Sequence, residues 1–554
     1  MNQFACKYTI AKVTATIFFC VLVFFHSEIQ AQNVSLSVNN STNYGIGNEF
    51  GFSGKEEKEY FESFTDLRLR SSNITVGVRM ELRKPAEFGP DEQAITRRYV
   101  EYRKEGLRLR AGDLYTLFNR GLSLNLFENR IIRYDTRLDG MLAEFETGMF
   151  GFSVVGGEIE YIEQLTFDEP NIHTERHSLR AAKMSFSPSR SFNITGSFLR
   201  SESAVPEYPF TIGFSDTVSV RNHIPEASVN VRLPFADFHV GYSYKFTEYA
   251  DSLESHGGGF YASISQTGRG YGVTLEFKDY RYNISDPFQE ANFLRPERML
   301  PFQNPPIAHR EHSYTLMSRE PHLVNFNDET GFFLDAFYSV SPRLLMNASL
   351  ALASRHYAFE LDNDTFEFNR VNRSNSWMPS LDRDKNPFFE VYTEGTYLLS
   401  DFISYVKLAY NYRYRYENDP YAPEFSTDLK IHNILAEVSY SLTPIWSVKL
   451  SSEHQFVYNS IYAANPNKYN QLITLQVAKS PTLSLSGRFE FTDTEDELSG
   501  RTSWFFVEGS YRIGQSHTIA AGYGSDRGGV VCTNGVCRVI NAFDGFRFSL
   551  TSTF

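Results

Sequence analysis

The chain has 554 residues, a formal net charge of −13 and an aromatic content of 15%. Its mean hydropathy of −0.35 excludes a bundle of apolar transmembrane helices, because each such helix needs about 20 consecutive apolar residues. The acidic balance argues against nucleic acid as a partner, and the many Phe and Tyr residues favour strands and membrane interfaces.

Residues 1–31 are typical of a secretory signal peptide. Lys7 and Lys12 supply its charged region, an apolar run extends from Val13 to Phe25, and Ala31 ends a plausible cleavage site. The run is shorter than the roughly 20 residues that span a bilayer, so a retained anchor is the less favoured alternative. We expect an exported protein whose mature chain begins at residue 32.

From about residue 60 onward, apolar and polar side chains alternate with a period of two, which is typical of strands with one apolar face and one wet face. One such segment places Val406, Leu408, Tyr410, Tyr412, Tyr414 and Tyr416 on one face, and Lys407, Ala409, Asn411, Arg413 and Arg415 on the other. A soluble β-sandwich also alternates, so connection lengths must discriminate between the two folds.

The connections between these segments alternate between short turns and long polar loops, as outer-membrane barrels require. The short turns lie at 71–73, 104–106, 147–148, 187–190, 235–237, 267–270, 341–343, 400–401, 443–445, 479–481 and 514–516. Long loops include 283–327 and 417–426. The sequence therefore predicts an all-β fold in which residues 32–554 form a single large antiparallel transmembrane β-barrel. We expect about 24 strands, within a range of about 22–26, with short periplasmic turns and long extracellular loops.

Residues 111–135 interrupt the alternation. We therefore expect this stretch to fold into the lumen as a constriction.

The last strand is the most specific single feature of the sequence. Phe546, Phe548, Leu550 and the terminal Phe554 share one face of it. An aromatic residue that ends such a strand resembles the C-terminal signal recognised in barrel assembly. We expect outer-membrane lipid and the barrel-assembly machinery to be partners.

Two of the four cysteines belong to the signal peptide, and Cys532 and Cys537 remain. The intervening Asn534-Gly535 favours a two-residue hairpin turn, which would bring the two thiols together. A disulfide in an oxidising compartment is the economical interpretation, with a metal site as the alternative. We expect the bridge to close a short external loop and to matter little to the barrel.

Several short motifs of the first third resemble a family of Bacteroidota outer-membrane barrels whose function is not established. They are Gly112-Asp113-Leu114-Tyr115, Asn119-Arg120-Gly121-Leu122, Leu138-Asp139-Gly140-Met141 and Gly156-Gly157-Glu158. Further along the chain the resemblance rests on the barrel pattern alone. It implies a location and a fold, and it supplies no active site.

The sequence offers little catalytic chemistry. Its 13 histidines are scattered and pair with no serine or carboxylate at a recognisable spacing. Acidic clusters such as Asp493, Glu495 and Asp496 lack the spacing of a calcium loop. We therefore expect no enzyme, no metal and no cofactor.

A set of arginines falls on the wet face by parity, and fewer carboxylates, chiefly Glu81 and Glu490, share that face. These lumen-lining candidates are Arg68, Arg70, Arg79, Arg108, Arg110, Arg232, Arg413, Arg415, Arg488 and Arg547. Arginine rings can favour anions in a pore, so we expect a basic inner wall.

The leading functional hypothesis is a channel or substrate-selective porin-like transporter in the cell outer membrane of a Gram-negative bacterium. A barrel of this size encloses more space than its own side chains fill. A TonB-dependent receptor is less favoured, because too few residues precede the first strands for an N-terminal plug domain. The alternative is a non-transporting barrel that anchors a secretion or surface-assembly complex. A plugged lumen would favour the anchor, and an open lumen the channel.

Overall fold

The computed structural model describes residues 34–51, 54–163, 173–206, 217–249, 254–282, 300–362, 364, 368–371, 377–419, 422–496, 499–533 and 536–554. The predicted signal peptide lies outside these ranges. Over the ranges given, no helix has both the length and the apolar character needed to cross a bilayer.

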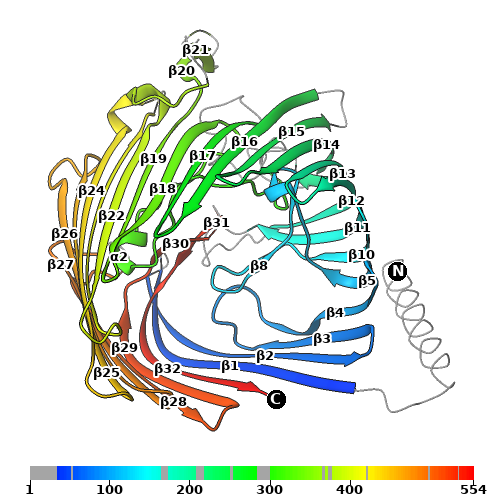
Figure 1. Ribbon diagram of the computed structural model, residues 1–554. Coiled ribbons are helices and arrows are strands. Elements are labelled where there is room, and N and C mark those ends of the chain that lie inside the picture. The colour runs from blue at the N-terminus through cyan, green and yellow to red at the C-terminus, as the bar shows by residue number, and fades with distance from the viewer. Residues whose placement is uncertain are drawn as a thin grey trace.

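A single 24-stranded antiparallel sheet forms the wall and closes on itself (Figure 1). The first strand, β1 (Val34–Gly51), pairs with β2 (Gly54–Ser71) on one side and with the last strand, β32 (Ala542–Thr553), on the other. Closure leaves no unpaired sheet edge, which a bilayer would not tolerate. The predicted fold class is confirmed, including the count of 24 strands.

The other wall strands follow one another around the ring in chain order. They are β3 (Ile74–Arg83), β4 (Glu92–Lys104), β5 (Leu107–Leu114), β10 (Leu138–Thr147), β11 (Phe150–Glu163), β12 (His173–Ser189), β13 (Phe192–Pro206), β14 (Thr217–Arg232), β15 (Asp237–Tyr249), β16 (Glu254–Gly268), β17 (Tyr271–Arg281), β18 (Glu329–Ser341), β19 (Leu344–Ser354), β22 (Phe388–Leu398), β23 (Tyr405–Glu417), β24 (Thr427–Ser441), β25 (Trp446–Asn459), β26 (Asn467–Lys479), β27 (Leu483–Thr492), β28 (Ser503–Ile513) and β29 (His517–Asp526).

The connections hold short strand pairs and single helical turns. The pairs are β6 (Leu117–Phe118) with β7 (Leu124–Asn125), β8 (Glu128–Asn129) with β9 (Tyr134–Asp135), β20 (Ala358–Leu361) with β21 (Phe368–Val371), and β30 (Gly529–Thr533) with β31 (Val536–Ile540). The helical turns are η1 (Asn119–Gly121), α2 (Thr315–Ser318), η3 (Arg383–Lys385) and η4 (Pro423–Phe425).

The two faces of a strand differ in burial as the alternation predicts. In β23, Leu408 is 61% exposed, whereas Asn411 is fully buried at 0%. Outward apolar side chains contact lipid in such a barrel, and inward ones face the lumen. Each predicted short turn joins two consecutive strands, as Ser71 and Ile74 illustrate at the end of β2 and the start of β3. The rhythm of short and long connections is therefore confirmed.

The C-terminal residue closes the seam between the first and last strands. The Phe554 amide donates to the Val38 carbonyl at 2.9 Å, and the Val38 amide donates to the Phe554 carbonyl at 3.1 Å. The Phe554 ring centroid also lies 5.1 Å from that of His517 in β29. The terminal residue thus joins three neighbouring strands.

We expect deletion of Phe554 to lower the amount of assembled barrel, because the seam loses both backbone hydrogen bonds and an aromatic contact. Phe548→Asp should act in the same direction, since an acidic side chain on the lipid face costs somewhat less than the roughly 2–4 kcal/mol of a midplane Lys or Arg. Heat-modifiable migration of membrane fractions on gels measures the folded amount. Wild-type levels of both variants would contradict a role of this strand in assembly.

Candidate functional site

Three long connections fold into the lumen and meet there. They are residues 115–137 between β5 and β10, residues 300–328 before β18, and the β30–β31 hairpin between β29 and β32. Figure 1 shows β8, β30 and β31 inside the ring of wall strands. We call these three segments together the plug.

An apolar core joins the plug to one sector of the wall. Its plug members are Phe118, Leu124, Leu126, Ile132, Tyr134, Leu300 and Phe302, with Val531 and Val536 of the hairpin packed against them. Its wall members, on β5 and β10 to β14, are Leu114, Leu138, Leu142, Val155, Ile159, Tyr161, Leu179, Ala181, Leu199 and Ile224. The prediction of a uniformly wet inner face is wrong in this sector. These inward side chains are apolar because protein, not water, covers them.

Direct hydrogen bonds hold the first two plug segments to each other. The Asn125 amide donates to the Phe302 carbonyl at 2.7 Å, and the Gln303 side chain donates to the Leu122 carbonyl at 2.8 Å. The Tyr134 hydroxyl donates to the Pro301 carbonyl. Segments more than 150 residues apart in the chain thus form one body, because |i−j| is 167 for the last pair.

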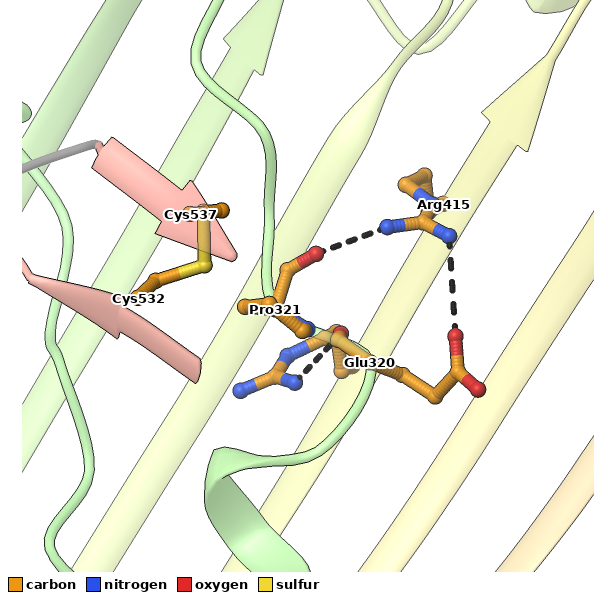
Figure 2. Close-up of a disulfide and its surroundings, with 6 residues drawn as sticks. Glu320, Pro321, Arg415, Cys532 and Cys537 are labelled. Carbon is orange, nitrogen blue, oxygen red and sulfur yellow. Dashed lines mark hydrogen bonds and ion pairs between the residues drawn. A yellow bond between two sulfur atoms is a disulfide. The ribbon is translucent and has the colours of Figure 1, made fainter. Parts of the chain in front are cut away.

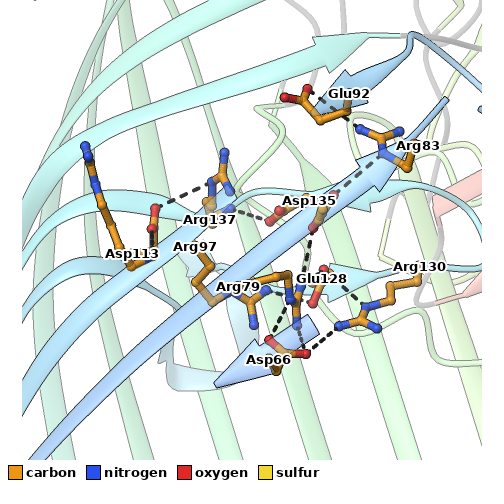
Figure 3. A network of polar contacts seen from close by, with 12 residues as sticks. Asp66, Arg79, Arg83, Glu92, Arg97, Asp113, Glu128, Arg130, Asp135 and Arg137 are labelled. Atoms are coloured by element: carbon orange, nitrogen blue, oxygen red, sulfur yellow. Dashed lines mark hydrogen bonds and ion pairs between the residues drawn. The ribbon is translucent and has the colours of Figure 1, made fainter. Parts of the chain in front are cut away.

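A charged network ties residues 115–137 to the wall at β2 to β4 (Figure 3). The Glu128 carboxylate accepts from Arg79 at 2.6 Å and from Arg97 at 2.8 Å. Arg79 also bonds Asp66 at 2.7 Å, and Arg130 bonds Asp66 at 3.2 Å. Burial favours a raised pKa for Glu128, but Arg97 and Arg79 outweigh it and hold that pKa below the usual value.

The segment 300–328 is held by arginines on the opposite part of the wall. Arg413 donates to the Arg319 and Glu320 carbonyls at 2.9 and 2.7 Å, and to the Glu390 carboxylate at 2.7 Å. Arg415 donates to the Pro321 carbonyl at 2.7 Å, as Figure 2 shows. These two arginines are therefore covered by the plug.

The remaining arginine candidates differ in their surroundings. Arg108 bonds Glu101 and Glu144, Arg110 bonds the Asp113 carbonyl and lies over the Tyr99 ring, Arg488 and Arg547 pair with Asp526, and Arg232 pairs with Asp237. Arg68 and Arg70 lie exposed near the end of β2. Most of these arginines are thus neutralised by nearby acidic groups.

The expectation of a basic inner wall with few carboxylates is wrong. Buried carboxylates at inward positions of the wall strands include Glu62, Glu175, Glu226, Glu329, Glu390, Glu394, Glu437, Glu453 and Glu490. Among the residues whose burial the structure describes, buried Arg and Lys side chains of the wall are fewer, namely Arg79, Lys245, Lys278 and Arg413. The sequence did contain a signal for this acidic inner wall, because Glu390 and Glu394 alternate with outward side chains and so fall on the inward face of their strand.

The hairpin lies in the lumen, which contradicts the expected external loop. Cys532 and Cys537 are joined by a disulfide, with their Cα atoms 4.1 Å apart. Their neighbours Val531 and Val536 pack against the apolar core of the plug. Figure 2 shows the bridge in the same view as the turn at Glu320 and Pro321. The bridge therefore belongs to the plug.

We expect Cys532→Ser with Cys537→Ser to loosen the hairpin while the barrel stays folded. A bridge that closes so short a loop contributes roughly 2 kcal/mol in the chain-entropy description. Hydrogen exchange of the amides in β30 and β31 should become faster, and exchange in β10 to β14 should change little. Unchanged exchange in the hairpin would show that packing alone holds it.

Within the described part of the chain, no three His, Cys, Asp or Glu side chains group as a metal site would require. In the acidic cluster of Asp493, Glu495 and Asp496, the Asp496 carboxylate pairs with Arg527 at 2.9 Å. The lumen instead contains ion pairs and apolar contacts that hold the plug against the wall.

Fold and site together define a closed transmembrane β-barrel whose lumen is occupied by its own connections. The chain belongs to a family of unknown function, DUF6029, whose model matches residues 10–554. No curated protein sequence matches the chain.

Several solved structures are similar to this chain. The siderophore receptor PirA from Pseudomonas aeruginosa has 9% identity and a TM-score of 0.44, covering 94% of this chain and 80% of its own. The copper transporter OprC gives the same identity, TM-score and coverage. The P pilus usher PapC translocation pore has 9% identity and a TM-score of 0.41, covering 94% of this chain and 99% of its own. These likenesses concern the fold alone.

Proposed function

We propose that this protein is a substrate-selective transporter of a Gram-negative outer membrane, reached by signal-peptide export, whose lumen is closed at rest by its own plug. The resemblance noted in the sequence favours a source among the Bacteroidota. The single observation that carries the proposal is the asymmetry of the plug's attachment. The large apolar core fixes it to β5 and β10 to β14, whereas the part beyond Phe302 is attached to β18 to β27 by hydrogen bonds, ion pairs and two small apolar clusters, one around Ala308 and one around Met317.

Polar attachments suit a part that moves. Arg319 pairs with Glu490 of β27, and the Glu453 carboxylate of β25 accepts from the backbone amides of Thr315 and Leu316 at 3.3 and 2.7 Å. Water can replace such bonds at small net cost, about 0.5–1.5 kcal/mol for a neutral hydrogen bond and more when a charge takes part. Water cannot replace the contacts of an apolar core in this way. Beyond Phe302, the apolar contacts of segment 300–328 belong to small clusters, chiefly those of Ala308 and Met317. This part is thus the one that can move, while Leu300 and Phe302 stay in the large core.

A non-transporting anchor is the second candidate, because the plug fills the lumen with its own core. A lock on the moving segment discriminates between the two. Thr315→Cys with Glu453→Cys places two thiols across a contact between segment 300–328 and the wall. Each single-cysteine variant is the matched control, since Glu453→Cys alone removes the same carboxylate.

Planar-bilayer recordings and solute flux into vesicles test the proposal. The transporter should show intermittent openings, which the oxidised double variant loses and a thiol reductant restores, while the singles keep opening. A wild-type protein that neither conducts nor passes solutes would overturn the proposal and leave the anchor. Openings that persist in the locked variant would exclude segment 300–328 as the gate.

A further inference from the structure

We propose that the inner wall on β11 to β16, between η1 and the short-turn end of the barrel, is a binding surface for a neutral, hydroxyl-bearing solute, specifically a short oligosaccharide. We call the short-turn end the lower end. This inference rests on the proposed transport function, because it names the class of substrate. Its site lies outside the apolar core.

Strand register arranges the polar side chains of this surface in rows. In one row Asn193 pairs with Asn230, Asn230 with His239, and His239 with Ser263, from β13 to β16. In the row above, register places Ser185, Thr195, Ser228 and Gly241 side by side, from β12 to β15. Paired residues share a face of the sheet, and neighbouring strands lie about 4.8 Å apart, so each row extends about 14 Å. These two rows carry hydroxyl, amide and imidazole groups and no carboxylate.

Hydrogen bonds orient the lower row. Asn193 Nδ2 donates to Ser187 Oγ at 2.8 Å, and Asn230 Nδ2 donates to Asn193 Oδ1 at 3.2 Å. His239 Nδ1 lies 2.7 Å from Asn230 Oδ1. Because Nδ1 must donate to this acceptor, the neutral ring presents Nε2 as an acceptor. The row is therefore a preformed set of donors and acceptors.

Two deeply buried groups of these rows, Ser228 Oγ and His239 Nε2, lack a partner among the described residues, as does Ser153 Oγ in the next row. That next row also holds Lys183 and Glu226, whose Oε1 has no partner among the described residues either. The exposed fractions of Ser153, Ser228 and His239 are 3%, 2% and 4%. A buried hydroxyl without a hydrogen bond costs about 1–3 kcal/mol, so each position calls for a ligand or water. Hydroxyl groups of a sugar both donate and accept, and they match this mixture without bringing a charge.

Two cavities adjoin along the rows, with η1 above them. One of about 340 Å³ is lined by Asn230, His239 and Ser263, by Arg120 and Arg190, and by the ion pair of Arg232 with Asp237. The other, of about 230 Å³, is lined by Asn119, Ser153 and Thr195 and by the charged Glu144, Glu146 and Lys183, and Asn193 borders both. Charges of both signs line these cavities, so the lining does not call for a ligand of either charge. Arg120 of η1 donates to Ser263 Oγ at 3.3 Å. The plug thus forms the ceiling of the surface, and a solute that passes the plug would meet it next.

Binding to the purified, folded barrel in detergent tests the inference. The probes are a panel of neutral tetrasaccharides from α-glucan, β-glucan, xylan and mannan, with a zwitterionic tetrapeptide as the charged comparison. We expect at least one tetrasaccharide to bind by calorimetry and the tetrapeptide not to bind. Asn230→Leu with His239→Phe should weaken sugar binding at least tenfold.

Ser349→Ala is the matched control, because Ser349 is an inward, buried serine of β19, outside this sector. It should leave sugar binding unchanged, and heat-modifiable migration verifies that every variant is folded. Binding of no sugar, binding of the peptide alone, or equal sugar binding by the double variant would overturn the inference and indicate that only water fills these positions. If the lock still stops conductance in that case, the transport proposal stands and only the substrate class falls.

Discussion

Replacing residues 116–136 with a short glycine-serine linker is expected to produce a barrel that conducts ions continuously. The segment supplies Phe118, Leu124 and Ile132 to the apolar core and Glu128 to the charged network. Without it, segment 300–328 and the hairpin lose the body against which they pack. A wall of 24 strands cannot fill its lumen with inward side chains alone, so a water-filled path should remain.

Single-channel recording measures this effect, and swelling of vesicles in small sugars provides a second readout. The matched control replaces the β20–β21 hairpin, a connection at the same end of the barrel that lies outside the plug. That control should keep the closed state. A folded linker variant without conductance would show that residues 115–137 do not close the barrel.

Glu390→Ala is expected to destabilise the folded barrel by about 3–5 kcal/mol, the range for a buried ion pair that loses one partner. Arg413 is only 3% exposed and Glu390 2%, so the guanidinium would remain buried without its counter-charge. Glu390 also accepts from the Asn411 side chain at 2.9 Å and contacts His312 of the plug at 3.0 Å. Urea titration in lipid vesicles, followed by tryptophan fluorescence, measures the free energy of unfolding.

Asp237→Ala is the control for this measurement. It removes the partner of Arg232 from a pair whose side chains are 74% and 58% exposed, where the expected loss is about 0–1 kcal/mol. Equal losses for the two variants would contradict the assignment of Arg413 and Glu390 as a buried attachment of the plug.

The barrel itself could be predicted from sequence because lipid imposes a simple rule on the outer face. Every second residue of a wall strand must be compatible with hydrocarbon, and this requirement leaves a period of two. Turn lengths then separate a membrane barrel from a soluble sandwich. Parity alone also places Leu408 outward and Asn411 inward.

The plug was harder to predict, because its contacts join residues distant in the chain. Arg79 meets Glu128 across 49 residues, and Arg413 meets the Arg319 carbonyl across 94. The interrupted alternation at 111–135 was one local signal, and β11 carried a second. Val154 is 58% exposed to the outside and its neighbour Val155 is 1% exposed, so both faces of β11 are apolar. A strand that is apolar on both faces is covered on both sides.

The order of the plug segments along the chain constrains how the molecule can be assembled. The apolar core combines wall residues from Leu114 to Ile224 with Phe302 and with Val531 and Val536. Contacts over such separations form late, because a long stretch of chain must first be brought together. The hairpin also directly precedes β32, the strand that seals the ring against β1. Sealing of the wall and completion of its interior therefore coincide, because Val531 and Val536 are the last residues of the chain to reach the apolar core. Until then the side of the core that they cover stays open, and it offers an assembly factor exposed apolar surface.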